Sequence, residues 1–176
     1  DYKVTGVQTC ALPIFATGLG YSPGNLYVLF ENLDDVVVHV NARTLMEMRR
    51  FCETHLNAGT EDQTALRTLA HAYLDFALKH SNRWLAVFEF KSATGGTLPA
   101  WYLQEVDGLF SLVRTALNIL RGDTDTPARL TTSVWSAVHG VCVLSLNSQL
   151  NLLGEDHDAP EVLDALIDQQ IGRAHV

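Results

Sequence analysis

Apolar residues recur at spacings of three and four along most of the chain, which is the spacing that one face of an α-helix presents. Polar segments, several of them with glycine or proline, interrupt this pattern at short intervals. The pattern predicts longer helices over about residues 36–56, 62–80, 99–121 and 127–153, and shorter ones near 23–30, 82–90 and 161–170. Helices joined by short connections predict an all-α fold in which the helices pack as a bundle.

The segment 36–56 has two interpretations. Residues 36–40 read Val-Val-Val-His-Val, and β-branched residues of this kind favour strands. However, Leu45, Met48 and Cys52 continue the apolar pattern at helical spacing, and residues 34–35 are two aspartates, which stabilise the positive end of a helix. Length therefore favours a helix, and about twenty helical residues span some 30 Å.

Residues that favour helix ends occur at several of the expected boundaries. Pro99 can occupy the first turn of its helix, where proline removes no intrahelical hydrogen bond. Thr126 is expected to cap a helix that has Pro127 at its first position. Asp158, followed three residues later by Glu161, predicts a capping box for the last helix.

The stretch from Gly20 to Phe30 combines a tight turn with a short helix. Gly20 permits a positive φ angle, Ser22 is expected to accept a backbone N–H as the N-cap, and Pro23 suits the first helical position. Leu26 and Phe30 lie four residues apart and therefore share one face, which we expect to be buried. A short capped helix of this form has the shape of a recognition helix.

Ala16 lies four residues before Gly20, and its small side chain would let a preceding helix pack closely across the turn, completing half of a helix-turn-helix. This stretch resembles the TetR family of bacterial transcriptional repressors. Leu29 stands where the family usually has His, and Leu33 stands where it usually has Lys. The matching positions are Ala16, Gly20, Tyr21, Ser22, Gly24, Leu26, Tyr27, Phe30 and Asn32.

The resemblance implies a DNA-binding surface on the short helix. Amide and hydroxyl groups reach base edges or phosphates, and backbone N–H groups at a helix start approach a phosphate. Without the resemblance, the same motif describes a capped turn inside an all-α protein. The residues expected to contact operator DNA are Ser22, Pro23, Gly24, Asn25 and Tyr27.

A second resemblance lies far from the first in the sequence. Trp135, His139 and Gly140 form a Trp-x-x-x-His-Gly element similar to the WHG-type C-terminal domain of one branch of TetR-like regulators, and residues 71–88 are similar to an earlier part of that domain. The resemblance implies a homodimer in which the last two helices of each subunit form a four-helix interface. It also implies a small apolar effector that alters the spacing of the two DNA-binding heads.

Trp135 and His139 are one helical turn apart, so both can face an internal cavity. Pockets between bundle helices are mostly apolar with a few polar groups, and this chemistry suits aromatic side chains beside one histidine. The alternative is a packed aromatic core in which His139 bonds to a neighbour. The candidate ligand-binding residues are Trp84, Trp101, Phe110, Trp135 and His139.

Both ends of the chain resemble translated sequencing adapter rather than natural protein. Residues 4–14 read VTGVQTCALPI and residues 171–176 read IGRAHV, although each could also be an ordinary flexible tail. We therefore expect adapter-derived tails at 1–14 and 171–176, a partial helix-turn-helix head at 15–40, and a ligand-binding and dimerisation domain at 41–170. The expected protein is a truncated TetR-like fragment whose own DNA binding is weak or absent.

Charge and composition narrow the function classes. The 176 residues carry a formal net charge of −8, and residues 15–42 include no Lys or Arg, which argues against a wholly basic nucleic-acid surface. An apolar content of 47% supports a sizeable core, while no apolar run is long enough to cross a membrane. We expect a cytoplasmic protein with no membrane partner, and buried thiols at Cys52 and Cys142.

The sequence predicts no catalytic residues, no metal site and no cofactor. It contains no His-x-x-x-His pair and no glycine-rich phosphate loop, and neither a nucleophile with its base nor a ligand set stands out. We therefore expect a TetR-like transcriptional regulator, acting as a repressor under a small-molecule effector. Two alternatives are a non-DNA-binding all-α ligand-binding or protein-interaction domain, and a hydrolase that uses His139.

Overall fold

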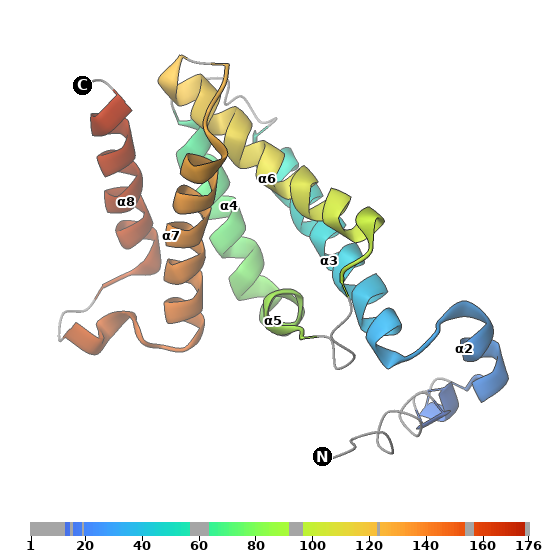
Figure 1. Ribbon diagram of the computed structural model, residues 1–176. Helices are drawn as coiled ribbons and strands as arrows, with labels where there is room; N and C mark the ends of the chain where they lie inside the picture. The colour runs from blue at the N-terminus through green and yellow to red at the C-terminus, as the bar shows by residue number, and fades with distance from the viewer. Residues whose placement is uncertain are drawn as a thin grey trace, which may run out of the picture.

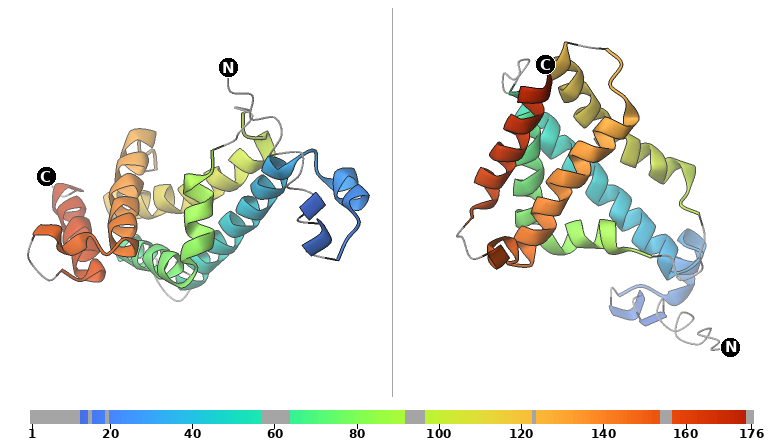
Figure 2. Two further views of the ribbon diagram at one scale, coloured as in Figure 1. Left: turned by 90° about the horizontal axis from the view of Figure 1, so that it is seen from below. Right: turned by 60° about the vertical axis from the view of Figure 1, so that its left-hand side comes forward.

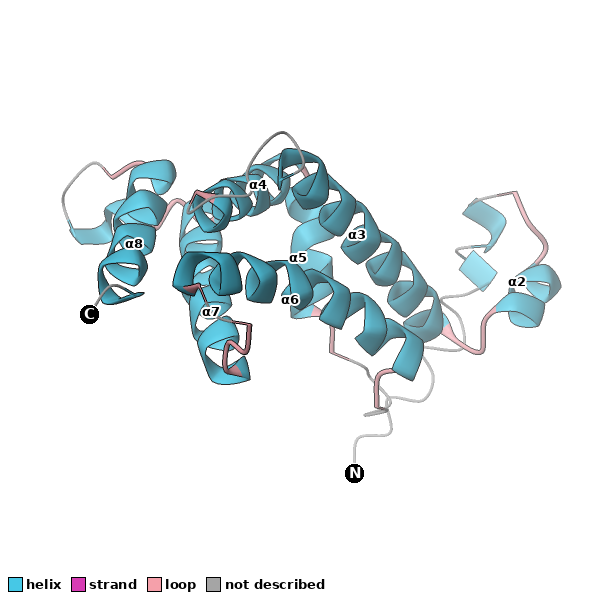
Figure 3. Ribbon diagram, turned by 90° about the horizontal axis from the view of Figure 1, so that it is seen from above, coloured by secondary structure: helices cyan, strands magenta, loops and turns pink. Residues whose placement is uncertain are grey.

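The computed structural model describes residues 13–14, 16–18, 20–56, 64–91, 97–122, 124–153 and 157–174, with residues 153 and 170–174 described without their side chains. Within these residues every regular element is a helix and none is a strand, which confirms the predicted all-α fold (Figure 3). The predicted adapter tails fall mostly outside the described residues, although the backbone of 171–174 continues the last helix. The elements are α2 (Pro23–Leu29), α3 (Leu33–Leu56), α4 (Ala65–Lys79), α5 (Ser81–Glu89), α6 (Ala100–Arg121), α7 (Ala128–Leu146), the 3₁₀ helix η1 (Leu150–Leu153) and α8 (Ala159–Ala174).

Helix α3 connects the two ends of the molecule. It begins beside α2 and runs along α6 into the body, while α8 lies at the opposite end from α2 (Figure 1). Leu45, Met48 and Cys52 are almost fully buried along one face of α3. The helical interpretation of residues 36–56 is thus confirmed, because the buried face extends well beyond the valine-rich segment and fixes the helical period.

The start of α3 is fixed by a reciprocal pair of hydrogen bonds. The Asn32 side-chain oxygen accepts the Asp35 backbone N–H at 3.0 Å, and the Asp35 carboxylate accepts the Glu31 N–H at 3.1 Å. This arrangement satisfies N–H groups that the helix itself leaves without partners, as a capping box does. The cap therefore sets the point at which the chain leaves α2 and enters α3.

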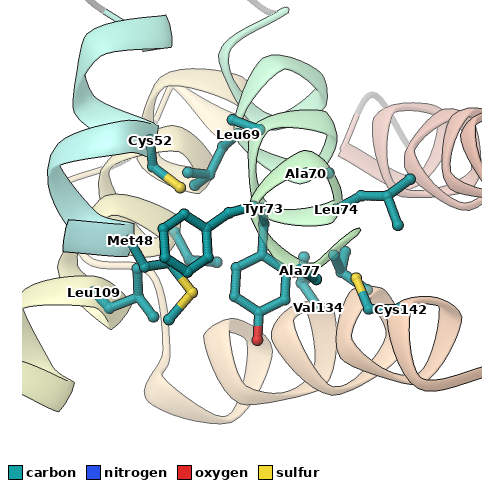
Figure 4. Packing of buried hydrophobic residues seen from close by; sticks show 14 of the residues in the cluster. Met48, Cys52, Leu69, Ala70, Tyr73, Leu74, Ala77, Leu109, Val134 and Cys142 are labelled. Carbon is teal, nitrogen blue, oxygen red and sulfur yellow. The ribbon is translucent and has the colours of Figure 1, made fainter. Parts of the chain in front are cut away.

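The main core lies where α3, α4, α6 and α7 meet. Met48 of α3, Leu69 and Tyr73 of α4, Leu109 of α6 and Val134 of α7 all contribute buried side chains to one cluster. Figure 4 shows these side chains converging, with the Tyr73 hydroxyl directed toward α7. The helices thus bury the apolar faces that the sequence predicts.

Helix α5 is held against α3 by polar contacts as well as by packing. Asn41, which is buried in α3, donates its side-chain N–H to the Ala86 carbonyl of α5 at 2.9 Å. Arg83 of α5 forms an ion pair with Glu47 of α3, and this hydrogen bond from Arg83 lowers the pKa of the Glu47 carboxyl, with a further contribution from Arg43. A shift of α5 would therefore be transmitted to α3.

Two helix starts differ from prediction. Pro99 and Pro127 occupy the N-cap positions of α6 and α7, one residue earlier than expected. The predicted Thr126 cap is wrong, because the Thr126 side-chain oxygen has no hydrogen-bond partner among the described residues. The Thr126 backbone N–H instead donates to the Asn118 side chain at 3.1 Å, which closes the connection from α6. Both helices begin one residue after their proline.

The predicted end of α7 near residue 153 is wrong. The helix stops at Leu146, where the Asn147 side chain donates to the Val143 carbonyl at 2.8 Å and Ser148 adopts a φ of 54°. The Gln149 N–H then bonds the Leu144 carbonyl at 2.8 Å, and η1 follows. Side-chain competition for a backbone carbonyl, followed by a left-handed residue, ends the helix.

Candidate functional site

The turn before α2 has the predicted geometry. Gly20 has a φ of 76°, and the Tyr21 N–H bonds the Ala16 carbonyl at 2.9 Å across the turn. Pro23 follows Ser22 at the first helical position, as predicted. The predicted side-chain cap is wrong, because the Ser22 hydroxyl makes no capping bond. The Ser22 carbonyl itself accepts the Asn25 N–H at 3.1 Å in a tightened first turn.

Helix α2 and its flanks form a small cluster of their own. Ala16, Leu26 and Val36 are buried together, and Phe30 packs partly buried against them. Leu33, at the position where the resembling family usually has Lys, also packs against this cluster. An apolar side chain there supports the packing of α2 on α3 and supplies no charge for a phosphate.

The predicted DNA-contact residues are all on the surface. Figure 2 shows α2 projecting from the body at the start of α3, and its buried side chain is Leu26. The neighbouring Val28 and Leu29 are also exposed, at 84% and 69%. The exposed predicted residues are Ser22, Pro23, Gly24, Asn25 and Tyr27.

Four of the five candidate ligand residues come together in the body, where α5, α6 and α7 face one another. The His139 ring stacks on Trp84 with centroids 4.6 Å apart, and it lies 4.9 Å from Trp135, whose ring is 5.1 Å from Phe110. Trp101 lies elsewhere, 40% exposed and 4.8 Å from the ring of His39. We call Tyr73, Trp84, Phe88, Phe110, Trp135 and His139 the aromatic cluster.

Sequence reasoning did not assign Tyr73 or Phe88 to the site. The Tyr73 hydroxyl and His139 Nδ1 are hydrogen-bonded at 3.0 Å, and the Phe88 ring lies 4.6 Å from the His139 ring. The available signal was a tyrosine on the apolar face of α4, because a buried hydroxyl requires a partner. That partner comes from α7, far along the chain.

Both titratable members of the cluster, Tyr73 and His139, are uncharged at neutral pH. Burial lowers the pKa of His139, so the neutral imidazole is favoured. Burial also raises the pKa of Tyr73, chiefly through loss of hydration. The bond between Tyr73 and His139 is therefore one between neutral groups inside an apolar surround.

A small apolar cavity adjoins the cluster between α4, α6 and α7. Its volume is about 30 Å³, and its lining includes Leu69, Tyr73, Leu109, Trp135 and Val138. Pockets for drug-sized ligands measure about 300–1,000 Å³, so this cavity is too small to hold such a ligand without enlarging. As it stands, His139 is bonded to a neighbour inside an aromatic core, and ligand contact stays a prediction.

Other site chemistries find little support in the described part of the chain. It holds no group of three or more His, Cys, Asp or Glu side chains placed to bind a metal ion. Cys52 and Cys142 are buried free thiols, and burial raises the pKa of each to about 12. Both cysteines are therefore protonated packing residues. None of the described helices is both long and apolar enough to span a membrane.

Residues 66–170, which include the whole aromatic cluster, match the family described as tetracyclin repressor-like, C-terminal domain. The chain belongs to this tetracyclin repressor-like (TetR-like) family. Helices α4 to α7, and α8 up to residue 170, therefore form its characteristic C-terminal domain. The region around α2 lies before the match, so its assignment rests on the sequence motif and its geometry.

Solved structures share the fold of this TetR-like chain. The crystal structure of a proposed regulatory protein, SCO4313, aligns with a TM-score of 0.73 at 21% identity, over 96% of this chain and 88% of that one. A protein of unknown function from Rhodococcus sp. RHA1 also aligns with a TM-score of 0.73, at 17% identity, over 92% of this chain and 82% of its own. A search of curated proteins found no match.

Proposed function

We propose that this TetR-like protein is a DNA-binding transcriptional repressor that works as a homodimer and is controlled by a small apolar effector. The observation that carries the proposal is the position of α3. One end of α3 holds the exposed helix α2, and the rest packs in the body against α4, α5 and α6. A helix of 24 residues is long enough to link a DNA-reading end to a distant ligand site.

DNA recognition in this proposal uses polar rather than charged groups. Ser22, Asn25 and Tyr27 offer hydroxyl and amide groups on an exposed helix. The backbone N–H of Gly24 would approach a phosphate, and Pro23, which has no N–H, would hold the helix start in place. Two such helices in a dimer would enter successive major grooves about 34 Å apart. Specificity would then come from amide and hydroxyl contacts to base edges.

Effector control would act through α5. Trp84 of α5 belongs to the aromatic cluster, while Arg83 and the Ala86 carbonyl hold the same helix on α3. A ligand that displaces Trp84 would therefore move α5 against the helix that carries α2. Such a ligand shifts the equilibrium only by the difference in its affinity for the two arrangements.

Dimerisation would use α7 and α8, which lie together at the far end of the molecule from α2 (Figure 1). Gly140 of α7 supports this assignment, since a Cβ atom there would meet no described atom within 4 Å. The close helix approach expected at this glycine is thus not made within the protomer. A second copy of the chain would supply it, beside the exposed Leu144.

A gel shift tests the proposal directly. The protein expressed from its uninterrupted genomic reading frame should retard its own promoter region at low salt. Tyr27→Ala should weaken that binding at least tenfold, which corresponds to about 1.4 kcal/mol. Leu103→Ala is the matched control, because Leu103 is 51% exposed on α6, outside α2 and outside the helices α7 and α8 proposed for the dimer.

The second candidate function is a ligand-binding or protein-interaction domain that does not bind DNA. The absence of Lys and Arg from residues 15–42 and the exposed Val28 and Leu29 favour it. An absence of any shift at low salt, from a protein that is folded and dimeric, would favour this function over repression.

A further inference from the structure

Two hydrogen-bond donors in the aromatic cluster are unused. The indole Nε1–H groups of Trp84 and Trp135 are buried and have no hydrogen-bond partner among the described residues. Trp84 as a whole is 0% exposed. A buried donor without a partner is destabilising because it has lost its hydration, and two such donors in one cluster indicate a place that suits a group accepting hydrogen bonds.

Both indoles surround the same polar pair. The Trp84 ring stacks on His139 at an interplanar angle of 27°, and its centroid lies 5.9 Å from that of Tyr73. Although burial dominates and raises the pKa of Tyr73, the N–H groups of Trp135 and Trp84 act on it in the opposite direction. Both donors therefore lie near the phenol oxygen, without the geometry of a full hydrogen bond to it.

The surroundings of these donors favour a ligand without charge. Neither the aromatic cluster nor the described lining of the adjoining cavity includes Asp, Glu, Lys or Arg, and His139 is neutral because burial lowers its pKa. An anion here would lose its hydration without gaining a cation, which is strongly unfavourable. A neutral acceptor oxygen loses far less on burial and gains the two N–H groups.

We propose that the aromatic cluster binds an uncharged, mainly apolar molecule carrying a hydrogen-bond acceptor oxygen, such as a ketone, ester or lactone. The oxygen accepts hydrogen bonds from Trp84 and Trp135, and the apolar body occupies an enlarged form of the cavity beside Tyr73 and Trp135. This proposal rests on the proposed function only in treating this space as the effector pocket. It adds the chemical class that the pocket selects.

Three small probes of similar shape separate the contributions of the acceptor oxygen, the apolar body and charge to binding. Acetophenone has a carbonyl on a phenyl ring, α-methylstyrene replaces that carbonyl by C=CH₂, and benzoate carries a charge. Each is titrated into the whole chain, and binding is followed by the ¹H–¹⁵N NMR signals of the indole N–H groups. The sequence holds three tryptophans, so exposed Trp101 is an internal control.

The expected result is saturable binding of acetophenone, with downfield shifts of the Trp84 and Trp135 indole protons and none at Trp101. α-Methylstyrene should bind at least fivefold more weakly without those downfield shifts, and benzoate should not bind. Equal binding of acetophenone and α-methylstyrene, preferred binding of benzoate, or no binding of any probe would each overturn the proposal.

A substitution at Trp135 tests whether its indole N–H is responsible for the preference for acetophenone. Trp135→Phe keeps an aromatic ring but removes the N–H, and it should abolish most of the preference for acetophenone over α-methylstyrene. Circular dichroism verifies that the variant folds. If it does not fold, the comparison of acetophenone with α-methylstyrene on the wild-type protein still tests the proposal. DNA is absent from these measurements, so they test the ligand class separately from DNA binding. The preference for acetophenone can fail while the gel shift succeeds, and the gel shift can fail while the preference is observed.

Discussion

Tyr73 and His139 form a hydrogen-bonded polar pair inside the aromatic cluster. Each side chain lies among aromatic rings and holds its partner at 3.0 Å. Buried polar groups of this kind stabilise a fold only while both remain. If one is removed, the other stays buried without a hydrogen bond and is no longer hydrated by water. The pair should therefore behave as a coupled unit when it is mutated.

Tyr73→Phe tests that coupling. The substitution leaves His139 Nδ1 without its partner, and the free energy of unfolding should fall by about 1–3 kcal/mol. Tyr73→Phe combined with His139→Leu should cost less than the sum of the two single changes, by about 0.5–3 kcal/mol. Urea unfolding of all four proteins measures the cycle, and strict additivity would show that the pair is not energetically coupled.

At the scale of elements, α8 is joined to α4 by an ionic cluster. Asp164 of α8 accepts a hydrogen bond from His71 at 2.8 Å and also pairs with Arg67, which contacts Asp168 as well. The His71 hydrogen bond, followed by that from Arg67, lowers the pKa of Asp164. The Asp164 side chain is 42% exposed, so solvent screens these pairs and limits their contribution.

The lowered pKa of Asp164 predicts a pH dependence for the docking of α8. The contribution of the Asp164 carboxylate to stability should be complete above the ordinary aspartate pKa of 3.8. It should disappear as the pH falls through the lower pKa that Asp164 has in the folded protein. Asp164→Asn should remove this acid dependence and lower stability at pH 7 by less than about 1 kcal/mol.

Urea unfolding between pH 2 and pH 7 measures both effects. Asp168→Asn is the matched control. Asp168 lies on the same face of α8 as Asp164 and also contacts Arg67, but its side chain is 64% exposed. An acid loss in Asp164→Asn that is as steep as in the wild type would contradict the assignment.

The helices were predictable where a long apolar face fixed the period, and less so where a local contact set the boundary. Leu45, Met48 and Cys52 predicted α3 correctly against a strand-like start. The end of α7 depends on the Asn147 side chain bonding to a carbonyl and on the backbone of Ser148, which no spacing of apolar residues indicates.

The candidate site was predictable to a similar degree. The motif containing Trp135 and His139 pointed to the cluster, and the structure brings Trp84 and Phe110 to it. Tyr73 was missed because its partner lies 66 residues away, and long-range pairing cannot be obtained from local spacing. Trp101 shares their chemistry but lies at the start of α6, beside His39.

At the scale of the whole molecule, α2 contacts the body through aromatic rings. Phe30, directly after α2, lies 5.3 Å from the ring of His39 on α3, and His39 lies 4.8 Å from Trp101 on α6. The end that would read DNA therefore contacts α3 directly, and it is connected to α6 through His39. A movement of α6 or α3 would change the direction in which α2 projects.

The proposed dimer gives a prediction at Gly140. Glycine in a helix costs about 1 kcal/mol relative to alanine, and nothing described in the protomer lies within 4 Å of an added methyl group. Gly140→Ala should therefore stabilise the protomer by roughly that amount. In a dimer that packs α7 closely against its copy, the same methyl should raise the dissociation constant at least tenfold.

Sedimentation of the folded protein over a range of concentrations measures dimerisation, and urea unfolding below the dissociation constant measures the protomer alone. Gly108→Ala is the control, because a methyl at that position of α6 would meet the Arg49 guanidinium, which pairs with Glu105 inside the same chain. This control should disturb a flexible side chain and leave the dimer unchanged. If Gly140→Ala also left the dimer unchanged while stabilising the protomer, the α7 surface around Gly140 would lie outside the interface, and dimerisation would have to use another face.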